Sequence, residues 1–145
     1  MSLYQHILCV VDLSEDNIEI ATRAAEMARL NEARLTLLHV VEYIPIDLAN
    51  ELVLPQQQEI EEQLVERAQR ALSELAGKLS CGQVDVSIVR GSTTGEIIDC
   101  AQSQQADLIV IGRHGRHGIS RLLGSTASAV LHHAPCDVLA VRVGE

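Results

Sequence analysis

The sequence predicts an α/β fold in which a doubly wound, five-stranded parallel sheet carries helices on both faces. Three observations lead to this fold class. Five short apolar runs recur along the 145 residues, and segments with helical periodicity separate them. Several runs are almost continuously apolar, which is typical of strands buried on both faces of a parallel sheet. Right-handed crossovers between such strands then leave the doubly wound sheet as the simplest arrangement.

Strands are expected where aliphatic and β-branched residues cluster. The run ILCVVDL near the start of the chain is the clearest, and LTLLHVV and DLIVIG have the same character. The connection over residues 42–55 is long for a strand-to-helix connection and carries two prolines. The expected strands cover residues 7–13, 35–41, 84–89, 108–111 and 138–143.

Helices are expected in the segments between and after these runs, over residues 15–31, 56–79, 94–105 and 125–134. In the first, Ser14 is a candidate cap, and Glu15 and Asp16 would stand in the first turn, where the helix dipole favours acids. Its inward stripe is expected to contain Ile18, Ala21, Ala25, Ala28 and Leu30. The second helix has apolar residues at spacings of three and four, which predicts that it covers the sheet.

Charge and composition exclude several classes of function. The formal net charge of −9 opposes binding to phosphate backbones and anionic membranes, and 1% aromatic residues leave little for base stacking. We therefore expect no nucleic-acid or membrane partner. Three of the ten arginines, Arg113, Arg116 and Arg121, nevertheless fall within nine residues. This local basic segment indicates either a small anionic ligand or a solvated loop.

Length and cysteine usage predict one domain over residues 1–145 in a reducing compartment. A single domain typically contains about 150 residues. The four cysteines form no CxxC pair and are expected to be free thiols rather than metal ligands. The first residues have neither a basic n-region nor an apolar run long enough for a signal peptide or a membrane span. The expected location is the cytoplasm.

The stretch from Gly112 to Ser128, GRHGRHGISRLLGSTAS, predicts an anion site directly after Ile111, the end of the fourth strand. Four of the nine glycines lie here, and they let backbone N–H groups approach a ligand. Arg113 and His114 add donors, and Gly124, Ser125 and Thr126 stand where a helix begins. The alternative is a glycine-rich turn in which Ser125 only caps the helix. Neither GxxxxGK[ST] nor GxGxxG is present, so neither a P-loop enzyme nor a dinucleotide dehydrogenase is indicated.

Asp12 is the second candidate, because it follows the first strand at its carboxyl end, where ligands of open α/β sheets bind. Its carboxylate could accept a hydrogen bond from an adenine amino group or a ribose hydroxyl. Alternatively, it caps the following helix, alone or together with Ser14, and the two roles are compatible.

These residues together resemble the universal stress protein family, in its small single-domain form. The opening HILCVVDLSEDN resembles the family's first strand and its Asp-x-Ser turn, and LTLLHVVE resembles the second strand. The segment ADLIVIGRHGRHGISRLLGSTASAVLHHAPCDVLAVRV resembles the nucleotide-binding branch, whose motif is Gly-x2-Gly-x9-Gly-[Ser/Thr]. Gly112, Gly115, Gly124 and Ser125 match it, although eight residues rather than nine separate Gly115 from Gly124.

The resemblance implies a Rossmann-like, three-layer α/β sandwich with four helices and strand order 3-2-1-4-5. It also implies a homodimer in which the last strand, from Val138 to Val143, pairs with its copy. The implied ligand is ATP, accompanied by Mg²⁺ or Mn²⁺ that the phosphates would mainly hold. In the implied complex, Asp12 and the Val40 backbone hold adenine, and Val10 and Val11 form the walls of its pocket. Gly112 and Gly115 lie along the ribose and the phosphates. The phosphates are held by Ser125, Thr126 and the Ala127 backbone.

Three functions remain open from the sequence. The first is a stress-response module that senses an adenine nucleotide. The second is a slow ATPase or autophosphorylating protein, although the loop lacks a phosphate-gripping lysine and its histidines have no paired carboxylate. The third is a family member that does not bind nucleotide. That branch lacks the loop glycines, which are present here, so the sensor is favoured and no catalytic residue is assigned.

Overall fold

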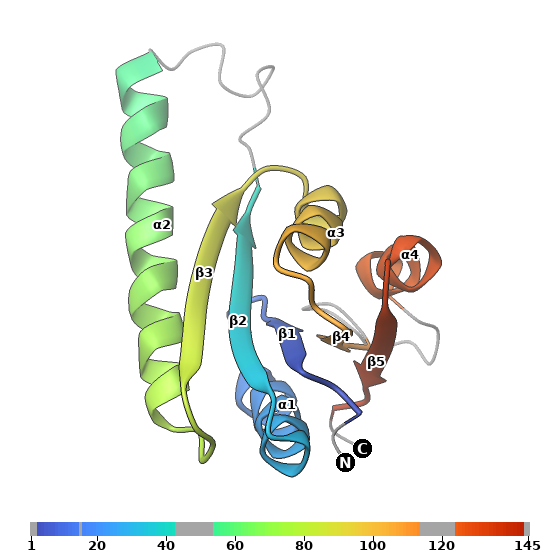
Figure 1. Cartoon of the computed structure of the whole chain (residues 1–145). Helices are drawn as coiled ribbons and strands as arrows, with labels where there is room; N and C mark the ends of the chain where they lie inside the picture. Colours follow the sequence, from blue (N-terminus) through green and yellow to red (C-terminus); the bar gives the residue numbers. More distant parts are fainter. Residues whose placement is uncertain (1–2, 15, 43–53, 114–123, 144–145) are drawn as a thin grey trace.

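The computed structural model describes residues 3–14, 16–42, 54–113 and 124–143. Strands and helices alternate along these segments without interruption (Figure 1). The strands are β1 (His6–Val10), β2 (Arg34–Val41), β3 (Val84–Arg90), β4 (Leu108–Gly112) and β5 (Asp137–Val141). The helices are α1 (Asn17–Asn31), α2 (Leu54–Gly77), α3 (Thr93–Ser103) and α4 (Ser125–His133).

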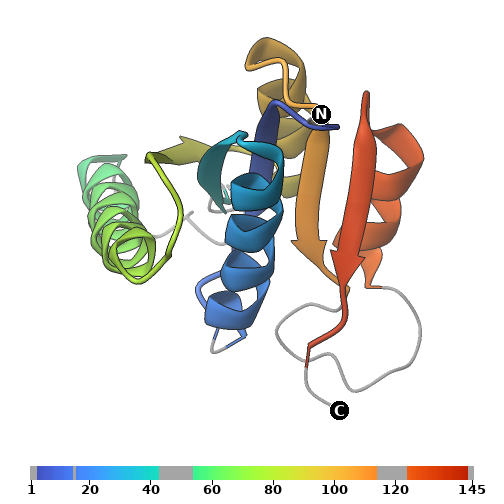
Figure 2. The same ribbon diagram turned by 60° about the horizontal axis from the view of Figure 1, so that its bottom comes forward.

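All neighbouring strands pair in parallel, in the order β3-β2-β1-β4-β5. The central strand β1 pairs on both sides, so that Leu8 lies between Thr36 of β2 and Ile109 of β4. Figure 2 shows α1 in front of the sheet and α3 behind it. The predicted fold class and strand order are therefore confirmed.

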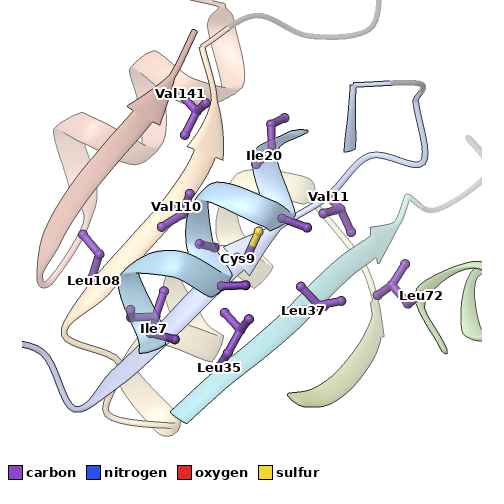
Figure 3. Packing of buried hydrophobic residues seen from close by; sticks show 14 residues of the cluster. Ile7, Cys9, Val11, Ile20, Leu35, Leu37, Leu72, Leu108, Val110 and Val141 are labelled. Atoms are coloured by element: carbon purple, nitrogen blue, oxygen red, sulfur yellow. The ribbon is translucent and has the colours of Figure 1, made fainter. Parts of the chain in front are cut away.

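One face of the sheet packs against α1 and α2 (Figure 3). Ile7 and Cys9 of the central strand β1, and Val11 just after it, project toward this face and are almost inaccessible to solvent. Opposite them, α1 presents only Ile20 and a run of alanines, and these small side chains let the helix approach the sheet closely. The alanines of this contact are Ala21, Ala24, Ala25 and Ala28.

The other face packs against α3 and α4. Because side chains alternate along a strand, Leu8 and Val10 point to this face, away from Ile7 and Cys9. They meet Ile97 and Ala101 of α3 and Val130 of α4, all buried. This separation into two apolar layers explains why the strands are apolar at successive positions rather than at alternate ones.

Several local expectations are wrong. The first strand ends at Val10 rather than at residue 13, because Leu13 has a positive φ of 66° that takes the chain out of the extended region. Ser14 does not cap α1, since the N-cap is Asp16 and has no side-chain cap bond. Ile18 and Leu30 face solvent, with 43% and 70% of their surface exposed. The buried stripe is centred instead on Ile20 and the alanines, which face β1.

The four cysteines are free, as expected. Within the described segments, no group of three or more His, Cys, Asp or Glu residues is placed to hold a metal ion. None of the helices in the described part of the chain combines the length and the apolar character that a membrane crossing requires.

Candidate functional site

A cleft opens at the carboxyl ends of the strands, beside the point where the chain order of the sheet reverses. From β1 the chain proceeds to β2 on one side, whereas β4 and β5 lie on the other. Ligands of open α/β sheets bind at such a switch point. The cleft has a volume of about 1330 Å³, larger than the roughly 300–1,000 Å³ of a common small-molecule pocket. Its size therefore accommodates a ligand much larger than a single ion.

The residues singled out in the sequence come together here. Eleven of the thirteen candidates lie on segments that the structure describes, and every one of them lines the cleft. They are Val10, Val11, Asp12, Val40, Ile111, Gly112, Arg113, Gly124, Ser125, Thr126 and Ala127. The other two, His114 and Gly115, lie outside the described residues.

A tight turn positions Asp12 at the end of β1. The Val11 N–H still donates to the Leu38 carbonyl at 2.9 Å, which continues the pairing with β2 for one residue. The Ser14 N–H then donates to Asp12 Oδ1 at 2.9 Å, and the Asp12 N–H donates to Asn17 Oδ1 at 3.2 Å. The carboxylate of Asp12 thus closes the turn before α1. This turn holds Asp12 at the edge of the cleft.

The beginning of α4 forms the opposite side of the cleft. Its N-cap residue, Gly124, has an extended conformation and gives no side-chain cap bond. The Arg113 N–H donates to the Val141 carbonyl and the Gly124 N–H donates to the Arg113 carbonyl, each at 2.8 Å. These bonds attach the residue before α4 to the ends of β4 and β5. The first N–H groups of a helix have no intrahelical partner and carry partial positive charge, so this side of the cleft favours an anion.

The cleft is electrically asymmetric. Toward β1 and β2 it is lined by the carboxylates of Asp12, Asp16 and Glu42, together with the cation Arg67 of α2, the helix that packs against β2 and β3. Toward β4 it is lined by Arg113 and the amino end of α4. A ligand with hydrogen-bond donors at one end and negative charge at the other matches this arrangement.

Sequence reasoning missed several cleft residues on β2 and on the helices. The Nδ1 of His39 lies 2.8 Å from the Val11 carbonyl, and since a carbonyl only accepts, Nδ1 donates this hydrogen bond. Glu42, Arg67 and Thr93 also line the cleft. His39 and Glu42 could have been found from their places at the end of a strand. Arg67 gives no such signal, because its position depends on how α2 packs.

A sequence model of the universal stress protein family matches residues 3–142 of the chain. The chain belongs to the universal stress protein family. Its curated relatives include universal stress protein A homolog 1 of Coxiella burnetii, which is 39% identical over 142 residues that cover 98% of this chain and 99% of the relative.

Solved universal stress proteins have the same fold. The UspA protein from Lactobacillus plantarum superposes with a TM-score of 0.83 at 30% identity, covering 98% of this chain and all of that one. A universal stress protein in complex with cAMP superposes with a TM-score of 0.67 at 22% identity, covering 99% of this chain and 100% of that one. The second likeness shows the shared fold alone.

Proposed function

We propose that this universal stress protein binds an adenine nucleotide, ATP, in the cleft and serves as a stress-response regulatory module. The observation that carries the proposal is that the cleft combines a hydrogen-bond acceptor, Asp12, with the N-terminus of α4, whose N-cap residue Gly124 has no side chain to cap it. A nucleotide has the complementary arrangement, with amino and hydroxyl donors at one end and phosphates at the other.

In the proposed complex, adenine lies toward Asp12 and the Val40 backbone. Val10, Val11 and Val40 are buried and supply apolar contacts to the ring. The ribose follows near Gly112, and the phosphates reach Ser125, Thr126 and the Ala127 N–H at the start of α4. His114 and Gly115 are proposed to continue the phosphate site.

Two further points support this choice of ligand. The solved universal stress protein that carries cAMP has this fold, so the fold accommodates an adenine nucleotide in that protein. A Mg²⁺ or Mn²⁺ ion, when it accompanies the nucleotide, would be held mainly by the phosphates. Phosphate oxygens are ligands of the hard oxygen type that such an ion prefers.

We propose sensing rather than turnover as the main activity. Hydrolysis requires a group that orients water near the terminal phosphate and groups that stabilise its developing charge. His39 lies on β2, which is separated by β1 from β4 and the start of α4, so it is poorly placed for either task. A slow ATPase or autophosphorylation remains the alternative function.

Calorimetric titration with ATP and Mg²⁺ tests the proposal. We expect micromolar binding by the wild-type protein, weaker binding by Ser125→Ala, and unchanged binding by Ser128→Ala, whose exposed serine lies on α4 but outside the cleft. Absence of heat and of thermal stabilisation at millimolar ATP would contradict the proposal. Phosphate release that Ser125→Ala and Gly115→Ala both abolish would support the ATPase instead.

We also propose a homodimer formed through the last strand. β5 is an edge of the sheet, and an edge strand exposes unpaired N–H and C=O groups that another chain can pair with. The apolar residues Val138, Leu139 and Ala140 on it are only partly buried. Sedimentation of the protein as a monomer at tens of micromolar would contradict this assembly.

The remaining expectations concern organisation and location. We propose that residues 1–145 form one domain, which the family match over residues 3–142 supports. Four free thiols suit a reducing compartment, and we propose the cytoplasm. The net charge of −9 supports the expectation that neither nucleic acids nor anionic membranes are partners.

A further inference from the structure

The cleft contains a second anchored carboxylate besides Asp12. Glu42 directly follows the last residue of β2, and Thr93 is the first residue of α3. The Thr93 hydroxyl donates a hydrogen bond to Glu42 Oε1, and both residues line the cleft. Thr93 thus holds the side chain of Glu42, a residue 51 positions away in the chain, at the edge of the cleft.

The turn between β3 and α3 fixes Thr93 relative to β2. The Gly91 N–H donates to the Val41 carbonyl at 3.0 Å, which ties this turn to the residue before Glu42. Gly91 has a φ of +146°, which favours glycine, and the Glu96 side chain lies over it so closely that an added Cβ would be 2.9 Å from Glu96 Cγ. These contacts fix the backbone of the turn, and therefore the position from which the Thr93 side chain reaches Glu42.

Glu42 lies on the same side of the sheet as the proposed base site. Side chains alternate along a strand, and Val40 points to the face covered by α3 and α4, as Val10 does. Two residues beyond Val40, Glu42 points to that face as well, where it meets Thr93. In the strand order, Glu42 lies on the far side of Asp12 from the start of α4. It is thus farther than Asp12 from the proposed phosphate site.

We propose that the Glu42–Thr93 pair selects the base of the nucleotide. Glu42 accepts a hydrogen bond from the exocyclic amino group of adenine and disfavours purines that carry a carbonyl oxygen at that position. The inference rests on the proposed nucleotide site and adds to it a selectivity for adenine over other purine bases. It concerns the base rather than the ribose, because the ribose lies between the base and the phosphates, nearer to α4.

The chemistry of the two groups explains the selection. An ionised carboxylate only accepts hydrogen bonds, and the Thr93 hydroxyl occupies Oε1, which leaves Oε2 to accept from the ligand. An amino group satisfies it, whereas a carbonyl oxygen at the same place repels it. Thr93 is a positioning residue, since without its hydrogen bond the exposed Glu42 side chain would sample many rotamers.

The test compares ATP with inosine triphosphate, in which a carbonyl oxygen replaces the adenine amino group. We expect the wild-type protein to bind ATP roughly tenfold or more tightly, as for one hydrogen bond to a charged group. Glu42→Gln should bring this ratio close to one, because an amide can turn either its NH₂ or its oxygen to the ligand. Thr93→Val should lower the ratio partly, and Thr93→Ser should preserve it.

Glu66→Gln is the matched control, because it makes the same chemical change on an exposed part of α2 outside the cleft. It should leave the ratio unchanged, and thermal unfolding should show that every variant folds. A wild-type ratio near one, or a Glu42→Gln variant that keeps the wild-type ratio, would overturn the base selection while nucleotide binding stands. A Glu42→Gln variant that changes only the preference for ATP over 2′-deoxy-ATP would assign Glu42 to the ribose and also overturn it. Failure of the wild-type protein to bind any nucleotide would remove the proposed function and this inference together.

Discussion

The two edges of the sheet treat polar groups in opposite ways. At the amino-terminal edge, the buried ring of His6 has a partner on each nitrogen, with the Gln104 carbonyl 3.0 Å from Nδ1 and Thr36 Oγ1 2.8 Å from Nε2. Asp107 accepts hydrogen bonds from the backbone N–H groups of Gln5 and His6. At the carboxyl-terminal edge, Ser125, Thr126 and the uncapped start of α4 face the cleft.

This difference separates stability from binding. A buried polar group without a partner destabilises the folded chain, so the amino-terminal edge is closed by mutual hydrogen bonds. The carboxyl-terminal edge instead places hydroxyls, carboxylates and the first N–H groups of α4 along the cleft, where a ligand can reach them. Substitutions at the first edge should therefore change the free energy of unfolding, and substitutions at the second should change ligand affinity.

The largest effect is expected from Ser125→Asp at the carboxyl-terminal edge. The added carboxylate should repel a bound phosphate by about 1–4 kcal/mol, which weakens ATP binding at least about fivefold. The same charge at a helix N-terminus should leave stability unchanged or raise it by about 0.3–1 kcal/mol. Calorimetry with ATP and urea unfolding measure the two quantities separately.

Ser128→Asp is the control for the charge, because Ser128 is exposed on the same helix but does not line the cleft. It should reduce ATP affinity much less than Ser125→Asp. Equal losses of affinity in the two variants would show that the helix start is not the phosphate site.

A smaller effect, on stability rather than on ATP affinity, is expected from Thr36→Val at the amino-terminal edge. Thr36 is 3% exposed, and its loss leaves the Nε2 atom of His6 buried without a partner. The free energy of unfolding should fall by about 1–3 kcal/mol, while ATP affinity stays unchanged. Thr22→Val on the exposed face of α1 should change stability by less than about 0.5 kcal/mol. A change in ATP affinity without a change in stability would break the distinction between the edges.

The smallest effect at neutral pH concerns Cys9, in the buried layer between the two edges. Burial raises the pKa of the Cys9 thiol from 9.0 to about 12. The folded chain therefore retains a proton that the unfolded chain releases, so stability should fall as the pH rises from about 9 toward 12. Urea unfolding across this range should show a shallower fall for Cys9→Ala. Equal slopes would indicate that another group, such as Tyr4, whose pKa its hydrogen bond to Asp137 raises, causes the loss.

Local pattern predicted the elements well where packing reinforced it. The apolar runs located all five strands, and the family resemblance supplied the order 3-2-1-4-5 that the sheet has. Pattern failed for α1, where Ile18 and Leu30 were expected inside and are exposed. Hydrophobicity suggested them, but the face of α1 that meets the sheet is the one carrying Ile20 and the alanines, whose small side chains allow a close approach of the helix.

The sequence by itself determined the chemistry available to the cleft, namely the carboxylate of Asp12 after β1, the glycines before α4, and the hydroxyls of Ser125 and Thr126 at its start. Strand periodicity and glycine content are local properties, so they can be interpreted without coordinates. Only the tertiary structure decided which distant residues meet. The contact between Glu42 and Thr93 depends on the pairing of β2 with β3 and on the turn at Gly91, because the partners of a side chain are set by the fold as a whole.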